Sequence, residues 1–133
     1  SAVQPLIKAA RDCEPTIRSN VTRWVWLWKD ARLDKIPVNA LEDTDERVRI
    51  SALMSLGIRG RPIDEKMILR ALEDKEAMVR YQAAYTLIRV SPKIAQKHLM
   101  NMFGDQDALC RLAAASLVDT SVKEASSILL NRK

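Results

Sequence analysis

Carboxylates and guanidinium groups recur along this chain at a fixed spacing. An aspartate is found every 31 residues, and each one is followed six residues later by an arginine. The pairs are Asp12 and Arg18, Asp43 and Arg49, Asp74 and Arg80, and Asp105 and Arg111. Four stacked arginines can bind phosphates, but every repeat supplies both charges, which favours a structural role. We expect each aspartate to bind backbone N–H groups at a helix start, and each arginine to pair with the aspartate of its own or the next repeat.

Other residues capable of chemistry are few. His98 is the single histidine, and the two cysteines, Cys13 and Cys110, are far apart in the sequence. Zinc, iron and copper sites draw on several His and Cys ligands at short spacing, and the sequence has no such group. It also contains no P-loop, no GxGxxG and no CxxC. The sequence therefore predicts that the protein is not an enzyme and uses no cofactor or metal.

Apolar residues recur around each Asp/Arg pair at the spacing typical of a helix, which predicts that helices carry these charged residues. They stand one residue before the arginine and three and seven residues after it, as well as two, three and six residues before the aspartate. Spacings of three and four form the apolar stripe of a helix. Each unit is therefore predicted to contain a helix A, a short turn at the aspartate, and a helix B that carries the arginine. Breakers at 34–37, 57–62 and 91–92 separate successive units, and Pro15 suits the first turn of the first helix B.

The period divides the chain into four repeats, at about 1–33, 34–62, 63–91 and 92–120. After them, Ser121 and Glu124 have the spacing of a capping box, which predicts a terminal helix over 121–133. A plain helical bundle has no reason to keep a fixed period. The predicted fold is therefore an all-α, right-handed α-solenoid of four two-helix repeats and a terminal helix, in a single domain over 1–133. Such an array is compatible with a piece of a longer repeat protein.

Two segments carry a family resemblance. LEDTDERVRISALMSLG (41–57) and LEDKEAMVRYQAAYTL (72–87) resemble HEAT repeats, of the short HEAT-like kind also found in phycobilin lyases. The turn aspartate, the valine after it and the arginine form the signature of that family. The match is weaker in the first repeat, with Glu-Pro-Thr at 14–16, and in the fourth, which has Gly104 and Cys110 where the others have Glu and Val. The resemblance implies a HEAT-like scaffold and leaves the ligand open, because such solenoids bind proteins, nucleic acids and small ligands.

Enzymes of the HEAT-like family need residues that this chain has in part or not at all. HEAT-like hydroxylases bind iron through His–Glu pairs, which are absent here, and no residue points to a bilin. HEAT-like alkylpurine DNA glycosylases place a Trp and an Asp in a concave cleft beside a basic rim. Trp26 and Asp30, with Arg23, Lys29 and Arg32, are faintly similar to that cleft. This similarity supports only an alternative function, a nucleic-acid-binding HEAT-like module.

The side of helix B opposite the apolar stripe predicts a binding surface. At about 100° per residue, this side holds the residues one, five and nine positions after each arginine. A solvated face carries Lys, Glu and Gln, whereas this one carries Ile, Met and Tyr, as protein interfaces do. The predicted partner-binding residues on the concave surface are Arg23, Trp26, Ile50, Met54, Ile58, Tyr81, Tyr85 and Arg89. In the alternative, the residues one position after the arginine pack against the neighbouring repeat.

Three tryptophans crowd the helix B of the first repeat. In one helix, Trp24 and Trp28 share a face and Trp26 lies roughly opposite, so one neighbour cannot bury all three. Three interpretations stay open: an N-terminal repeat covers one face, Trp26 is exposed near Arg23 and Lys29, or the terminal core is unusually large. An exposed Trp beside an Arg is suited to a protein hot spot or to stacking on a base.

Charge and hydropathy indicate the class of partner and the compartment. The chain has 22 basic and 17 acidic residues, mixed along the sequence, for a net charge of +5. This surplus permits nucleic-acid binding without requiring it, so the predicted function is a protein–protein interaction scaffold or adaptor. The sequence has no run of eighteen apolar residues for a transmembrane helix, and its start has no signal-peptide pattern. Because Cys13 and Cys110 are predicted to lie too far apart for a disulfide, we expect a reducing compartment, the cytoplasm.

Overall fold

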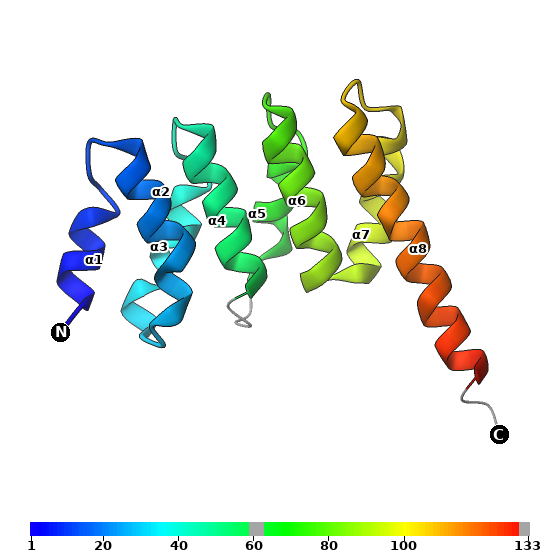
Figure 1. The fold of residues 1–133 in the computed structure, drawn as a ribbon, viewed down its shortest axis with the longest axis horizontal. Helices are drawn as coiled ribbons and strands as arrows, with labels where there is room; N and C mark the ends of the chain where they lie inside the picture. Colours follow the sequence, from blue (N-terminus) through cyan, green and yellow to red (C-terminus); the bar gives the residue numbers. More distant parts are fainter. Residues whose placement is uncertain (59–62, 131–133) are drawn as a thin grey trace.

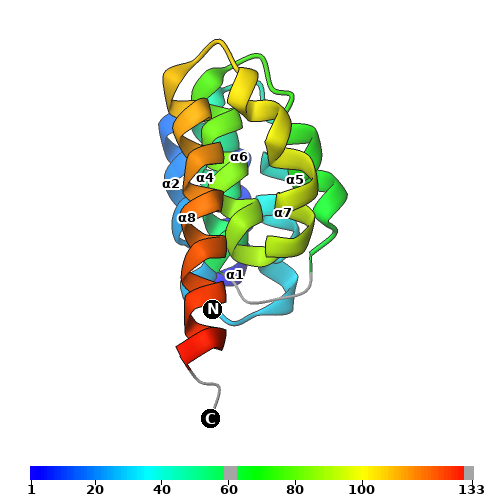
Figure 2. The same cartoon turned by 90° about the vertical axis from the view of Figure 1, so that its right-hand side faces the viewer.

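The computed structural model describes residues 1–58 and 63–130, except for the side chains of 120–122 and 124–129. In these residues the helices alternate between two layers, and no strand is present (Figures 1 and 2). The A layer contains α1 (Val3–Ala9), α3 (Lys35–Ala40), α5 (Glu65–Ala71) and α7 (Pro92–His98). The B layer contains α2 (Pro15–Trp24), α4 (Glu46–Ile58), α6 (Ala77–Val90) and α8 (Ala108–Leu130). Short 3₁₀ segments are η1 (Val25–Leu27), η2 (Ala31–Leu33) and η3 (Leu99–Gly104). The predicted all-α solenoid is confirmed.

Consecutive B helices lie side by side along the array, and the A helices pack behind them (Figure 1). Small residues three positions after the paired arginines let the helices approach closely, and Ala52, Ala83 and Ala114 are fully buried. Leu53 and Leu87 are also fully buried, and burial of such a side chain stabilises the fold by about 1.5–3 kcal/mol. The main core cluster extends from α4 to α8, so each repeat depends on its neighbours for burial.

Prolines begin helices at two places, as expected, and differ from expectation at a third. α2 begins at Pro15 and α7 at Pro92, where the missing N–H removes no intrahelical bond. The sequence predicts a breaker at Pro37, but this residue lies inside α3, two residues after its start. N–H groups in the first turn have no intrahelical acceptor, so proline fits there as well. Gly57, from the next predicted breaker, belongs to α4, and residues 59–62 lie outside the described chain.

The predicted terminal helix is not a separate element. α8 runs without interruption from Ala108 to Leu130, so Ser121 lies inside a helix and does not begin one. A capping box begins a helix after a non-helical segment. The residues before Ser121 are already helical and contain no Gly or Pro that breaks the helix. Lys123 Nζ lies 2.8 Å from Asp119 Oδ2, one turn earlier in the same helix. Residues 131–133 of the predicted helix lie outside the described chain.

The tryptophan segment also differs from expectation, because the first B helix is short. α2 ends at Trp24 and the 3₁₀ turn η1 follows, so Trp24 and Trp28 do not share a helical face. Trp24 is 50% exposed and Trp28 39% exposed, whereas Trp26 is half-buried, with its ring centroid 6.5 Å from that of Trp24. The interpretation that Trp26 is the exposed tryptophan is therefore wrong.

Candidate interaction surface

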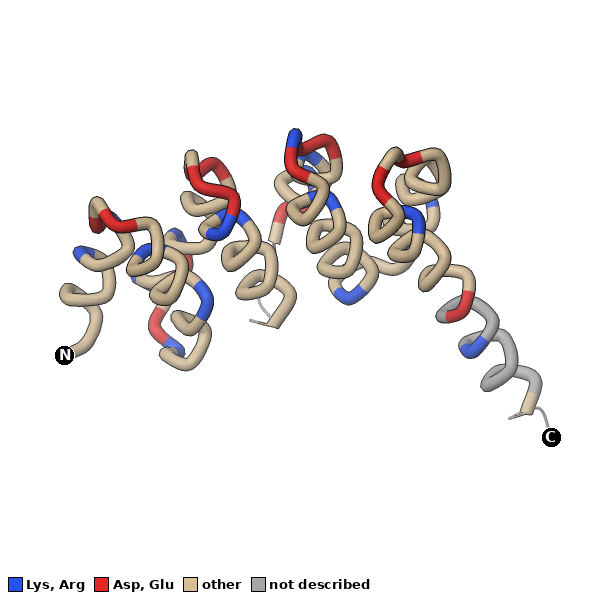
Figure 3. Tube along the Cα trace, turned by 45° about the horizontal axis from the view of Figure 1, so that its top comes forward, with Lys and Arg blue, Asp and Glu red and all other residues tan. Residues whose placement is uncertain are grey.

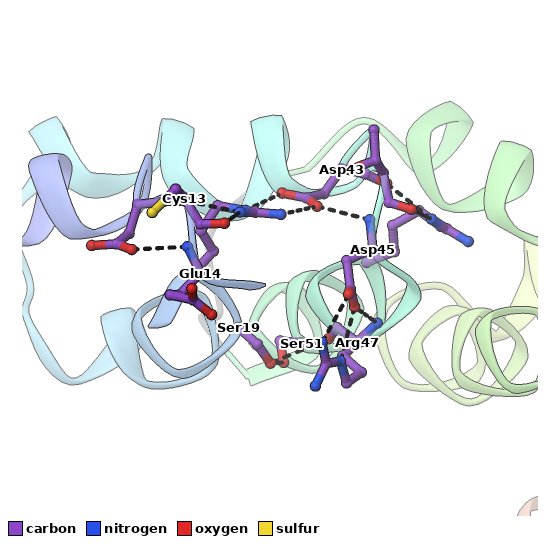
Figure 4. Close-up of polar contacts among 11 residues, drawn as sticks. Cys13, Glu14, Ser19, Asp43, Asp45, Arg47 and Ser51 are labelled. Carbon is purple, nitrogen blue, oxygen red and sulfur yellow. Dashed lines mark hydrogen bonds and ion pairs between the residues drawn. The ribbon is translucent and has the colours of Figure 1, made fainter. Parts of the chain in front are cut away.

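The Asp/Arg pairs join successive repeats at the turns between A and B helices. Three arginines donate their Nε and Nη2 to both carboxylate oxygens of the aspartate 25 residues further along the chain. The pairs are Arg18–Asp43 (2.9 and 3.0 Å), Arg49–Asp74 (2.9 and 3.1 Å) and Arg80–Asp105 (3.1 and 3.1 Å). Figure 4 shows the hydrogen bonds at Asp43. We call each pair a rung, and we call the series of rungs, together with Asp12 and Arg111 at its two ends, the ladder. Each rung links two repeats, because the arginine binds the aspartate of the next repeat.

Each rung is also tied to the backbone of its own turn. Nη1 of Arg18 donates to the carbonyl oxygens of Asp12 at 2.8 Å and Cys13 at 3.1 Å, and the other ladder arginines repeat this pattern. Oδ1 of Asp43 accepts the N–H of Asp45 at 2.9 Å, which holds the turn before α4. The side chains of the three rungs are only 9–18% exposed. Their guanidinium groups are therefore already occupied within the fold, which leaves them poorly placed to bind phosphates.

Two of the rungs lower the pKa of their carboxyl groups. Burial by itself raises the pKa of Asp43, but the hydrogen bonds from Arg18 and from the N–H of Asp45 outweigh it, so the pKa lies below the ordinary 3.8. The hydrogen bond from Arg80 is the main cause that lowers the pKa of Asp105. Beside the ladder, hydrogen bonds from the side chain of Arg47 lower the pKa of Asp45 to about 2 (Figure 4). Asp43 and Asp105 are thus ionised at neutral pH.

Part of the predicted partner-binding set lies in the seams between consecutive B helices. Ile50, Tyr81 and Tyr85 are half-buried and pack against the main core cluster. The ring centroids of Tyr81 and Tyr85 are 4.9 Å apart, and Tyr85 Oη shares a hydrogen bond of 3.0 Å with Ser116 Oγ of α8. Burial raises the pKa of Tyr81. These residues therefore contribute to packing between repeats as well as to the surface.

The other predicted residues differ in exposure. Ile58, at the end of α4, is 40% exposed, and Arg89 in α6 is exposed. Met54 in α4 and Trp26 in η1 are half-buried. The open part of the predicted set is therefore the far end of the B helices, away from the ladder.

Arg23 lies in a polar seam between α2 and α4. Its Nη2 lies 3.4 Å from Ser51 Oγ, and Ser51 and Ser19 share a hydrogen bond of 2.7 Å (Figure 4). Nε of Arg23 and Oγ of Ser55 are buried, and neither has a hydrogen-bond partner within the described residues. Arg23 therefore serves the contact between two repeats in addition to any contact with a partner.

Two exposed apolar residues of the B layer were not predicted, because only positions after each arginine were considered. Met78 in α6 is 46% exposed, and Leu109 in α8 is 41% exposed. Both stand two positions before a ladder arginine, about 20° around the helix from the position five residues after it. Cys110 Sγ lies 3.4 Å from Ala77 O, which brings the first turns of α6 and α8 side by side. We call the following residues the outer B face: Ile50, Met54, Ile58, Met78, Tyr81, Tyr85 and Leu109.

Apolar and charged side chains are divided between the two layers. Among the described residues, the large apolar side chains with high exposure lie in the B helices or just after α2, apart from Met100 and Phe103 of η3. The A helices instead expose basic side chains such as Lys8, Lys35 and Lys66, and acidic residues gather at the turns between A and B helices (Figure 3). Exposed apolar surface of this kind marks sites of protein interaction.

The described residues also form a hollow away from this surface. A hollow of about 440 Å³ lies near α1 and α3, lined in part by Arg11, Lys35 and Ile36. Arg18 and Asp43, which also line it, already bind each other. The described part of the chain contains no group of three His, Cys, Asp or Glu side chains that could hold a metal. It also contains no helix long and apolar enough to cross a membrane.

Comparison with known protein families agrees with this architecture. Residues 3–65 match the family model for HEAT repeats, and residues 63–133 match the one described as the Vacuolar 14 Fab1-binding region. The chain belongs to the HEAT-like repeat proteins. Its second part, just over half of its length, belongs to the Fab1-binding-region family. Neither description names phycobilin lyases, so that subtype stays a prediction, and no curated protein matches the chain. Both families are typical of protein-interaction scaffolds.

Proposed function

We propose that this HEAT-like chain is a scaffold that binds a partner protein through its outer B face. The observation that carries the proposal is the pair of exposed apolar residues at equivalent positions of adjacent helices, Met78 in α6 and Leu109 in α8. Beside them, Tyr81 and Tyr85 present half-buried rings. Protein interfaces are enriched in Met and Tyr, and a rigid, partly packed tyrosine loses little conformational entropy when a partner covers it.

The family comparison supports the C-terminal half of the chain as the binding region. Residues 63–133 match the Vacuolar 14 Fab1-binding region, and α6 and α8 both lie in that range. By its description that family binds Fab1, so a Fab1 protein is the first partner to test. The partner side of such a contact is expected to be apolar, because the exposed groups of α6 and α8 are mainly apolar.

Substitutions on the two layers test this surface. With Fab1 immobilised on a biosensor, Met78→Lys and Leu109→Lys should each weaken binding at least about tenfold, mainly by faster dissociation. The matched control is Met100→Lys, which introduces the same charge at a methionine of η3 that is 60% exposed. This control should bind as the unchanged chain does. Far-UV circular dichroism of all three variants checks that each is folded.

The outcomes separate this function from its alternatives. Equal loss in Met100→Lys and Met78→Lys would argue against the outer B face. If Fab1 does not bind, a photo-crosslinking residue at Leu109 should capture another protein that one at Met100 does not. Submicromolar binding of a generic duplex at about 150 mM salt would instead favour nucleic acid, with affinity that falls steeply as salt rises.

A further inference from the structure

The hollow of about 440 Å³ near α1 and α3 combines apolar and basic side chains. Its buried and half-buried apolar lining residues, which we call the floor, are Ile7, Ala10, Ile36 and Ala40. Its exposed lining residues, which we call the rim, are Arg11, Arg32, Lys35 and Asn39. Lys35 and Asn39 stand one helical turn apart on α3, and Arg11 follows the end of α1. The two A helices thus place cationic groups beside an apolar surface.

Two of the cationic groups of the rim have no carboxylate partner among the described residues. Arg18 and Asp43 of the lining bind each other in a rung, and Nη2 of Arg32 lies 2.6 Å from Oδ2 of Asp30. Arg11 and Lys35 form no ion pair with any residue that the structure describes. The rim therefore presents two positive charges that the fold does not neutralise.

The next gap in the A layer, between α3 and α5, has the same register but balanced charge. Its hollow is smaller, about 250 Å³. The residues there that stand 31 positions after the floor residues are Val38, Leu41, Met67 and Ala71. Glu42 takes the place of Arg11, and the third repeat also has a glutamate at this position, Glu73. Arg70 takes the place of Asn39, and its Nη1 lies 3.9 Å from Oε1 of Glu42. The basic rim is therefore specific to the first gap.

The hollow lies between two consecutive repeats, so it does not depend on what precedes the chain. α3 lines it with Ile36, Asn39 and Ala40. The residues of α1 that stand 31 positions earlier are Pro5, Lys8 and Ala9. By the same register, these residues would face a preceding repeat, whereas the floor residues of α1 face α3. A longer array would leave the hollow in place.

We propose that this hollow binds an acidic peptide segment of a second partner, with an apolar side chain on the floor and carboxylates at Arg11 and Lys35. A guanidinium group can donate two parallel hydrogen bonds to one carboxylate, and the ammonium group of Lys35 supplies a second point charge. A free phosphate or carboxylate would bind the rim alone and leave the floor in contact with water. A peptide that is both acidic and apolar matches the two parts of the lining.

This site goes beyond the proposed function, because it lies in the A layer and uses none of the outer B face. The two surfaces are on opposite layers of the solenoid (Figure 2), so both can be occupied at the same time. Loss of Fab1 binding would therefore leave the peptide site untouched, and the reverse also holds.

A peptide selection identifies the ligand without assuming its sequence. A phage library of random dodecapeptides is selected on the immobilised whole chain and, in parallel, on Arg11→Glu. This variant gives the first repeat the glutamate that Glu42 and Glu73 provide in the next two, so it should fold. The unchanged chain should enrich peptides in which acidic residues flank an apolar one, and the variant should not.

Fluorescence anisotropy then measures the Kd of the most enriched peptide, synthesised with a label. Arg11→Glu and Lys35→Glu should each raise this Kd at least about tenfold, and higher salt should weaken binding because exposed charges are screened. The matched controls Arg70→Glu and Lys66→Glu make the same charge reversals on exposed residues of the second gap and should bind as the unchanged chain does. Circular dichroism checks that every variant is folded.

Three results would overturn the proposal. The first is a selection in which the unchanged chain enriches acidic peptides no more than Arg11→Glu does. The second is a selected peptide whose Kd is unchanged in Arg11→Glu and Lys35→Glu but raised in Met78→Lys, which would place it on the outer B face. The third is equal binding of a peptide in which serine replaces the apolar residue, which would indicate a simple anion site.

Discussion

Removal of one complete rung tests whether the ladder stabilises the solenoid. In Arg80→Ala, the two bonds of 3.1 Å to Asp105 are lost, together with those to the carbonyl oxygens of Asp74 at 2.9 Å and Lys75 at 3.3 Å. A charge-assisted hydrogen bond contributes about 1.5–3 kcal/mol in favourable cases. The side chains of Arg80 and Asp105 are 18% and 13% exposed, so solvent screens part of this attraction. We expect the free energy of unfolding to fall by about 1–3 kcal/mol.

Arg111→Ala is the matched control, because the chain itself offers an arginine without its rung. Arg111 makes the same two turn contacts, at 2.8 and 3.1 Å, and binds no carboxylate of a following repeat in the described chain. Its replacement should cost less than about 1 kcal/mol. Urea unfolding at low protein concentration, followed by far-UV circular dichroism, measures both losses. With a urea dependence of about 1–3 kcal/mol per M, a loss of about 2 kcal/mol moves the midpoint by roughly 1 M. Equal losses in the two variants would refute a stabilising role for the rung.

Fluorescence adds a second readout, because all three tryptophans lie within 24–28 and report on the first repeat. Repeats of a solenoid are coupled only through their interfaces. Arg80→Ala should therefore shift the midpoint seen by circular dichroism more than the midpoint seen by fluorescence. Identical shifts would mean that the whole array unfolds as one cooperative unit.

Acid should weaken the fold, because the pKa values of Asp43 and Asp105 are lowered below the ordinary 3.8 in the folded chain. As the pH falls, the unfolded chain binds protons at a higher pH than the folded chain does. The stability that these carboxylates contribute is therefore present above about pH 4 and is lost as the pH falls through the folded pKa values. Thermal melts from about pH 6 to about pH 2 measure this, and a constant Tm over that range would contradict it. Gly57→Ala should stabilise the chain by up to about 1 kcal/mol, because alanine favours the helix. The added Cβ would lie 3.6 Å from Thr86 Cγ2, an ordinary contact, so a lower Tm would show that α4 and α6 cannot admit a methyl group.

Much of the architecture could be predicted from the sequence because it depends on local patterns. The spacing of apolar residues around Asp43 and Arg49 recurs around Asp74 and Arg80, and that period implies stacked helical hairpins. Helix starts at Pro15 and Pro92 follow from backbone chemistry that acts within one turn. A local pattern fails where its context changes. Ser121 has a capping sequence, but the residues before it are already helical, so α8 continues through it.

The candidate surface was only partly predictable, because exposure depends on neighbours that a single helix does not specify. Periodicity selects Tyr81 and Tyr85 as outward residues, yet the close approach of α8 half-buries them. The end of α2 at Trp24 likewise removes the helical geometry on which the tryptophan argument depended.

The sequence by itself determined the alternation of helices and the identity of the charged residues at their turns, since both patterns recur every 31 residues. Only the tertiary structure decided that the arginine of each rung binds the carboxylate of the aspartate 25 residues ahead and not the carboxylate of the one six residues behind it. The physical reason is stacking. The guanidinium group spans the gap between neighbouring turns, where Nε and Nη2 meet a carboxylate of the next repeat while Nη1 is held by the carbonyl oxygens of its own.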